Sequence, residues 1–270
     1  MNTWDNISSN WEYVLPPSRP SIIELDRISK LINKYNRNEP VAVLGSTVEY
    51  RDLLYEMNFT NVYIFEKNMS FHKSLNSWKI YPNTNETVIV GDWINTIHMY
   101  ENFFNVCLSD LTMGNIAYEL RDSFYYSISK SLKKKGVFID KVLTNELPLI
   151  TIKELKMKYS NLPINLRTVN DFSCEALFCS ELLNVGIINT TEFYSCLKKN
   201  FAKEKRLMKY IEKSHLITPE KCIWYYGLPW NEVNKSYLKH LVIIDCFEDE
   251  IQSPYYGRLK IHICHNKQGG

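Results

Sequence analysis

The chain has 270 residues, of which 45% are hydrophobic and 23% charged, and its formal net charge at pH 7 is +2. This length and composition predict one large globular domain, or one domain with an insertion. The small net charge, without a long basic run, argues against a nucleic-acid partner held through its phosphates. No apolar stretch approaches the roughly 20 residues that a membrane span requires, so no membrane partner is expected.

The cysteine pattern and the N-terminal residues both predict a cytoplasmic location. The seven cysteines are scattered and several lie in apolar, strand-like runs, which is typical of reduced, buried thiols. Residues 1–5 contain no basic segment followed by an apolar one, so a signal peptide is not expected. His262, Cys264 and His265 lie close together, but no second ligand pair at zinc spacing exists, so no metal is predicted.

Residues 1–20 combine aromatic residues with several prolines, which predicts an extended arm rather than a helix. We expect this arm to pack against the body of the domain. A sharper possibility is that Tyr13 or Arg19 closes over a ligand, with Arg19 pairing a carboxylate. Ser21-Ile22-Ile23-Glu24 matches a capping box, and apolar residues then recur at helical spacing, so a helix is predicted over 21–35.

The next stretch reads as strand, glycine turn, helix, strand and acid. The apolar run 41–44 stops at Gly45, a helical pattern follows, and the apolar run 62–65 ends at Glu66. This is the layout of a nucleotide-binding βαβ unit, whose glycine allows close approach of a ligand and whose acid accepts hydrogen bonds from a ribose diol. A single glycine favours a nucleoside ligand without phosphates. The alternative is an ordinary turn followed by a solvated acid.

Two further apolar runs also end in acids. The run 87–90 leads to Gly91-Asp92-Trp93, and the run 104–109 ends at Asp110. A helix is predicted up to residue 132, with Lys133-Lys134-Lys135 as its solvated C-terminus and a fifth strand over 137–142. Because such alternation produces a parallel sheet with helices on both faces, the carboxyl ends of the strands should meet at one crevice.

Residues 147–229 interrupt this regularity. Asn189-Thr190-Thr191-Glu192 is expected to cap one long helix that reaches Ile211, and a further helical portion is expected around 175–183. The pattern then predicts a helix over 231–240 and an antiparallel hairpin of strands at 241–247 and 258–264. We therefore divide the chain into an arm (1–20), a ligand-binding domain (21–146 and 230–270) and a helical insertion or cap (147–229).

This arrangement resembles the class I S-adenosylmethionine-dependent methyltransferases. The resemblance rests on the order of elements, on the loop Gly45-Ser46-Thr47-Val48-Glu49 and on the upstream sequence Arg19-Pro20-Ser21. It implies an α/β fold with a doubly wound, seven-stranded, mostly parallel sheet whose last strand is antiparallel, plus a helical insertion. It also implies S-adenosylmethionine as the cofactor.

The resemblance further implies the roles of the site residues. Asp110 would lie near the methionine amino group or the acceptor, which makes it the candidate catalytic residue. Glu66 would hold the ribose hydroxyls, and Asp92 would accept a hydrogen bond from the adenine amine. The remaining implied or expected cofactor-binding residues are Gly45 and Ser46 at the methionine, Lys67, Met69 and Trp93 around the adenine, Gly91 directly before Asp92, and Tyr13 and Arg19 in the arm.

The predicted activity is methyl transfer to oxygen or nitrogen of a small-molecule or short peptide acceptor by in-line displacement. Asp110-Leu111-Thr112-Met113 differs from the acidic-Pro-Pro-aromatic run of many nucleic-acid amino-methyltransferases, so a base amine is not the expected acceptor. Two alternatives stay open: a non-catalytic binding or scaffold subunit with this fold, and a nicotinamide-dependent oxidoreductase. The sequence makes no prediction of oligomeric state.

Overall fold

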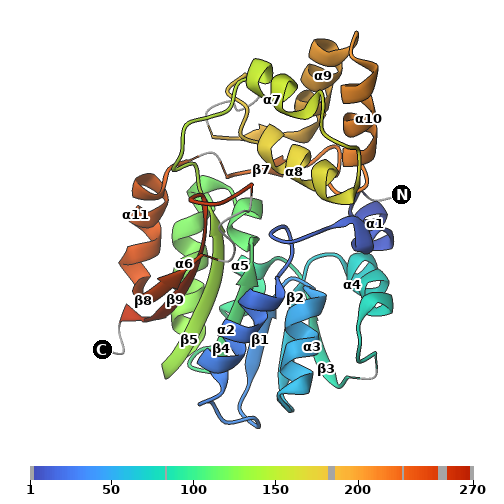
Figure 1. The fold of residues 1–270 in the computed structure, drawn as a ribbon. Helices are drawn as coiled ribbons and strands as arrows, with labels where there is room; N and C mark the ends of the chain where they lie inside the picture. The colour runs from blue at the N-terminus through green and yellow to red at the C-terminus, as the bar shows by residue number, and fades with distance from the viewer. Residues whose placement is uncertain (1–2, 83, 182–185, 227, 249–253, 268–270) are drawn as a thin grey trace.

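The computed structural model describes residues 3–82, 84–181, 186–226, 228–248 and 254–267. Its centre is a seven-stranded sheet in the order β3-β2-β1-β4-β5-β9-β8 (Figure 1). The strands β1 to β5 pair in parallel, whereas β9 is antiparallel to both β5 and β8. The predicted fold class and C-terminal hairpin are therefore confirmed. The strands are β1 (Val41–Leu44), β2 (Val62–Glu66), β3 (Glu86–Val90), β4 (Phe104–Asp110), β5 (Leu132–Leu143), β8 (Leu241–Phe247) and β9 (Leu259–Asn266).

Helices cover both faces of this sheet. Val41 and Val43 belong to the hydrophobic cluster under α2 and α3, whereas Ala42 and Leu44 belong to the cluster under α5, α6 and α11. This alternation explains why β1 is apolar at every position, as expected for a parallel strand buried on both faces. The helices are α2 (Ile22–Ile32), α3 (Val48–Glu56), α4 (Met69–Leu75), α5 (Trp93–Ile97), α6 (Arg121–Ser131) and α11 (Trp230–His240).

The N-terminal arm differs from the prediction. It contains a helix, α1 (Thr3–Ser9), and a 3-10 turn (Trp11–Tyr13), so the expectation of a non-helical arm was wrong. The prolines all follow residue 15 and restrict only that part of the arm. The expected packing against the domain is confirmed, because the Trp4 ring meets the Phe71 ring of α4 edge-on at 5.5 Å.

The three lysines 133–135 lie in β5 and not at a helix C-terminus, so that prediction was wrong. Helix α6 ends at Ser131, and Leu132 pairs with Phe104 of β4 as the first residue of the strand. The register then shifts before Val106 pairs with Val137. The buried side chain of Leu132 explains the early start of the strand, while the irregular pairing leaves Lys134 and Lys135 exposed.

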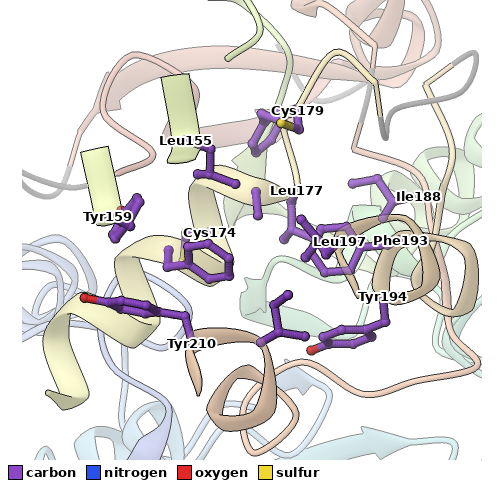
Figure 2. Close-up of a cluster of buried hydrophobic side chains, with 14 of the residues drawn as sticks. Leu155, Tyr159, Cys174, Leu177, Cys179, Ile188, Phe193, Tyr194, Leu197 and Tyr210 are labelled. Carbon is purple, nitrogen blue, oxygen red and sulfur yellow. The ribbon is translucent and has the colours of Figure 1, made fainter. Parts of the chain in front are cut away.

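The insertion packs around a hydrophobic cluster (Figure 2), to which Leu143, Tyr255 and Leu259 also contribute, and it lies above the sheet, next to α1 (Figure 1). The predicted long helix is two helices that break at residues 202–204, because Phe201 and Leu207 both fold back into that cluster. The helix predicted around 175–183 ends at Ala176, and residues 182 and 183 lie outside the described part. The elements are α7 (Ile152–Tyr159), α8 (Leu166–Ala176), β6 (Ile188–Asn189), α9 (Thr190–Phe201), α10 (Lys205–Ser214) and β7 (Ile223–Trp224).

In the part of the chain that the structure describes, every helix falls short of the length and apolar character needed to cross a bilayer.

One buried carboxyl stands out within the sheet. Asp140 lies in β5 with no exposed surface, and Ser109 and Tyr237 approach it without completing a hydrogen bond of good geometry. Burial raises its pKa to about 7. Because the unfolded chain releases this proton near pH 4, Asp140 makes folding less favourable as the pH rises from about 4 to 7.

Asp140→Asn should therefore flatten the fall in stability across this pH range. At pH values above 7 we expect the variant to be more stable than the wild type by about 1–2 kcal/mol, since the gain is reduced by the amide's own need for partners. Urea unfolding at several pH values measures the effect, with the exposed Asp26→Asn as control. An unchanged slope between pH 4 and 7 would contradict this assignment.

Candidate active site

A cavity of about 870 Å³ opens at the carboxyl ends of β1 to β4 and extends to the insertion. Its lining includes Gly45, Glu66, Asp92 and Asp110, the residues that follow or end these four strands. The structure therefore places along one cavity the four residues that the sequence pattern placed at one crevice. Of the other expected site residues, the cavity lining also includes Ser46, Lys67, Met69 and Trp93, whereas Gly91, Tyr13 and Arg19 are not part of it.

The Glu66 carboxylate ends β2 and is fixed by two hydrogen bonds. The backbone N–H of Asn68 donates to Oε1 over 2.8 Å, and the Ser46 hydroxyl donates to Oε2 over 2.9 Å. Burial raises the pKa of Glu66, and these hydrogen bonds only partly offset that effect. A carboxylate can accept about four hydrogen bonds, so this one keeps acceptor positions for a ligand.

Ser46 also contacts the imidazole ring of His72. Its Oγ lies 3.0 Å from Nδ1 of His72, a buried residue of α4. Burial beside Arg51 lowers the pKa of His72 to about 4, so the ring is neutral near pH 7. When Ser46 donates to Glu66, His72 must donate from Nδ1. The three side chains thus form a chain of hydrogen bonds that orients the Glu66 carboxylate.

The turn after β1 depends on Gly45. Its φ of +86° lies in the left-handed region that side chains rarely adopt. Its N–H donates to the Phe65 carbonyl over 2.8 Å, and the Trp93 indole N–H donates to the same carbonyl over 2.8 Å. A Cβ at Gly45 would lie 4.0 Å from the Trp93 ring. The turn and the indole therefore border the same part of the cavity.

Asp92 caps the helix α5. Its Oδ1 accepts from the N–H of Ile94 over 3.1 Å, and its Oδ2 pairs with Nζ of Lys67 at 3.1 Å. Lys67 is largely exposed, and an exposed pair of this kind contributes at most about 1 kcal/mol. The pair can therefore open for a ligand donor at Oδ2 while Oδ1 keeps the helix capped.

Asp110 belongs to a buried network of charges at the base of the cavity. Nζ of Lys141 lies 3.2 Å from Asp110 Oδ1 and 2.9 Å from Glu24 Oε2, and Tyr50 donates to Glu24 over 2.5 Å. Burial raises the pKa of Asp110 above its ordinary range, Lys141 opposes this, and Glu24 and Glu49 add to it. Asp110 can therefore exchange a proton near neutral pH.

The backbone next to Asp110 is strained. Leu111 adopts φ +55°, which costs a non-glycine residue of order 1–3 kcal/mol. Its N–H donates to the Lys141 carbonyl over 3.1 Å, and its carbonyl accepts from the Tyr226 hydroxyl over 3.1 Å. These contacts fix the chain where the sheet meets the insertion.

In this structure Arg19 and Tyr13 form contacts that hold the arm against the rest of the chain. Arg19 Nη1 lies 3.3 Å from Oε1 of Glu49, which also accepts from the Trp11 indole over 3.2 Å. The Tyr13 carbonyl accepts from the Asn170 amide over 2.7 Å, which ties the arm to α8. The carboxylate that Arg19 pairs is therefore Glu49, a residue of the loop that the resemblance singled out.

The sequence predicts a cap over residues 147–229 but does not identify most of the individual residues on the far side of the cavity. We call the lining contributed by the arm, the insertion and the segment before β9 the cap wall. Trp224, Tyr225, Tyr226 and Trp230 lie close together in the sequence, which is a local signal for part of this wall. The rest of the wall is assembled by tertiary packing. The cap wall consists of Trp4, Ile7, Trp11, Val14, Ser18, Ser173, Cys174, Leu177, Ile217, Thr218, Pro219, Trp224, Tyr225, Tyr226 and Tyr255.

Among the described residues, no group of three or more histidine, cysteine or acidic side chains is placed to hold a metal ion. His262 and Cys264 are both buried in β9, where the Trp230 ring packs on His262 at 4.5 Å.

The sheet order and the antiparallel β9 form a Rossmann-like α/β fold, which is also found in S-adenosylmethionine-dependent methyltransferases of known structure. Solved structures of several such enzymes superpose on nearly the whole chain. The CcbJ methyltransferase of Streptomyces caelestis is 10% identical, with a TM-score of 0.56 and 98% of each chain covered. An S-adenosylmethionine-dependent methyltransferase of Clostridium acetobutylicum is 12% identical, with a TM-score of 0.51 and 89% of each chain covered.

A solved structure whose description names a different activity has the same fold. A structure described as "Putative Zn-dependent Alcohol Dehydrogenases from Rhodobacter sphaeroides" is 12% identical, with a TM-score of 0.60 and coverage of 98% of this chain and 97% of that one. No family model and no curated protein sequence matches the chain. At these identities the likeness establishes the fold alone.

Proposed function

We propose that the protein is an S-adenosylmethionine-dependent methyltransferase that acts on a small-molecule acceptor. The observation that carries this proposal is the gathering of Gly45, Glu66, Asp92 and Asp110 along one cavity at the ends of four adjacent strands. Ligands of open α/β sheets bind at this position. Three carboxylates and a single glycine turn suit a cationic nucleoside without phosphates better than a dinucleotide.

The residues present fit this cofactor. Glu66 keeps acceptor positions for two ribose hydroxyls, and Asp92 can accept from the adenine amine beside Trp93. Lys67 and Met69 would flank the adenine, and Gly45 and Ser46 the methionine group. When bound, S-adenosylmethionine supplies an activated methyl group.

Asp110 has two possible roles: it pairs the methionine amino group, or it takes the proton of the acceptor hydroxyl or amine. Burial raises its pKa above the ordinary range, which suits the second role near neutral pH. Arg19 and Tyr13 would act indirectly, by holding the arm over the site, and residues 147–229 together with the arm would select the acceptor.

Calorimetric titration with S-adenosylhomocysteine, S-adenosylmethionine and NADH tests the proposal. We expect both adenosyl compounds to bind one site per chain and NADH not to bind. A ligand at about 100 times its dissociation constant should also stabilise the chain by about 2.7 kcal/mol, visible as a higher unfolding temperature.

The other outcomes favour the other functions. Binding of NADH alone would favour an oxidoreductase, the activity named for the Rhodobacter structure. Binding of neither class of ligand would favour a scaffold subunit. Either result would contradict the proposed function.

A further inference from the structure

The two sides of the cavity differ in chemistry. The charged residues among the described lining are Glu66, Lys67, Asp92 and Asp110, and all four belong to the side formed by the sheet. The cap wall is built from uncharged side chains throughout its described part. The cofactor assigned above is charged and would use the first side, which leaves the cap wall for the acceptor.

Aromatic rings form much of the cap wall. Six of its residues are aromatic: Trp4, Trp11, Trp224, Tyr225, Tyr226 and Tyr255. They come from three separate parts of the chain, the arm, the end of the insertion and the segment before β9. Rings of this kind pack on other flat rings in offset or edge-on geometry and bury a large apolar area.

Several polar side-chain atoms of the cap wall already have hydrogen-bond partners within the protein. The Ser173 hydroxyl donates to the Val169 carbonyl over 2.9 Å, and the Tyr226 hydroxyl donates to the Leu111 carbonyl over 3.1 Å. Ser18 Oγ and Cys174 Sγ lie 3.6 Å apart. Burial raises the pKa of the Cys174 thiol to about 11, so it is neutral. A peptide bound against these four side chains would therefore meet polar atoms that already have partners.

A charged acceptor would be costly to bind against this surface. Moving an ion from water to an apolar site without a counter-ion is strongly unfavourable, whereas an aromatic ring gains by the same transfer. The cavity is also large, since about 870 Å³ is near the upper end of the roughly 300–1,000 Å³ typical of ligand pockets.

We infer that the acceptor is an uncharged, flat aromatic small molecule whose rings bind against the cap wall and whose methylated group faces Asp110. This inference rests on the proposed function, because the other side of the cavity is assigned to the cofactor.

Four probes with related ring skeletons test it on the full chain. 2-Naphthol is neutral and flat, 2-naphthoate is anionic, 2-(aminomethyl)naphthalene is cationic, and 2-decalol is neutral and saturated. They are titrated by calorimetry near neutral pH, with and without saturating S-adenosylhomocysteine. We expect 2-naphthol to bind at least about tenfold more tightly than either charged probe, and several-fold more tightly than 2-decalol.

A charge placed in the cap wall should change this order. Ser18 is partly exposed and Ser77 is exposed and outside the lining, so Ser18→Lys and Ser77→Lys add the same charge in two places. Ser18→Lys should strengthen 2-naphthoate binding by about tenfold, and Ser77→Lys should leave all four affinities unchanged.

The four titrations of the wild-type chain test the inference even if Ser18→Lys does not fold. If either charged probe binds as tightly as 2-naphthol or more tightly, the inference that the acceptor is uncharged is wrong. If 2-decalol binds as tightly as 2-naphthol, the inference that the acceptor is aromatic is wrong. If S-adenosylhomocysteine does not bind while 2-naphthol keeps its advantage, the proposed function fails and the preference of the cap wall stands.

Discussion

Glu66→Ala should weaken binding of S-adenosylhomocysteine by about a hundredfold or more. The wild-type carboxylate accepts hydrogen bonds from the Ser46 hydroxyl and the Asn68 backbone N–H, so its orientation is already fixed before a ribose diol binds. A hydrogen bond to a charged group is worth about 1.5–3 kcal/mol, and the diol offers two donors. The loss of both corresponds to at least two powers of ten in affinity.

Calorimetry on a graded set of variants measures this effect. Ser46→Ala keeps the carboxylate but removes one anchor, so we expect a loss of about tenfold or less. Glu66→Gln should lie between Ser46→Ala and Glu66→Ala, because the amide keeps one acceptor. Glu101 is exposed and outside the cavity, so Glu101→Ala is the matched control and should bind like the wild type.

Thermal unfolding of each variant separates lost binding from lost structure. If Glu66→Ala is folded and binds within twofold of the wild type, Glu66 does not hold the ribose and the orientation of the cofactor proposed here is wrong.

The strand ends were predictable from the sequence because local signals define them. A parallel strand buried on both faces is an apolar run, and it ends where a glycine or an acid begins the turn, as at Gly45, Glu66 and Asp110. Since parallel strands place these ends on one edge of the sheet, the sheet side of the site followed from the pattern alone.

Most residues of the cap wall, and the pairing of Asp110 with Lys141 and Glu24 at the base of the cavity, could not be predicted in this way. Ser21 caps α2 as expected, with its hydroxyl accepting from the Glu24 N–H over 3.0 Å. A capping box would turn the Glu24 side chain back to the helix start, but it points instead to Tyr50 and Lys141. The local motif is compatible with both orientations, and only the packing of α2 against β5 decides between them.

The same limit applies to the insertion and the arm. The apolar spacing from Phe193 to Ile211 fits one continuous helix as well as two helices packed against each other, because both bury the same residues. In the arm, the prolines restrict their own positions and the residues directly before them, so they carried no information about Thr3–Ser9.

Lys141→Met should destabilise the protein by about 3–5 kcal/mol near neutral pH, the cost of leaving buried charges without their partner. Lys141 and Glu24 have no exposed side-chain surface, and Asp110 has 5%. Methionine keeps the apolar stem but removes the charge that lowers the pKa of Asp110, so this pKa should rise further.

The dependence on pH distinguishes lost charge from lost packing. A carboxyl whose pKa is higher in the folded than in the unfolded chain destabilises the fold as the pH rises towards the folded value. The difference in unfolding free energy between the wild type and Lys141→Met should therefore be small at acid pH and grow towards neutral and alkaline pH. Urea unfolding across this range measures it.

Two further variants make the test specific. Lys133 pairs with Glu39 at a half-buried site, so Lys133→Met should cost less than about 1 kcal/mol at any pH. Adding Glu24→Gln to Lys141→Met removes one of the two buried acids and should recover part of the lost stability. A loss that does not change with pH, and that Glu24→Gln does not reduce, would mean that Lys141 acts only through its stem. If instead the loss follows pH, Lys141 controls the protonation of Asp110, and any step in which Asp110 takes a proton should shift to higher pH in the variant.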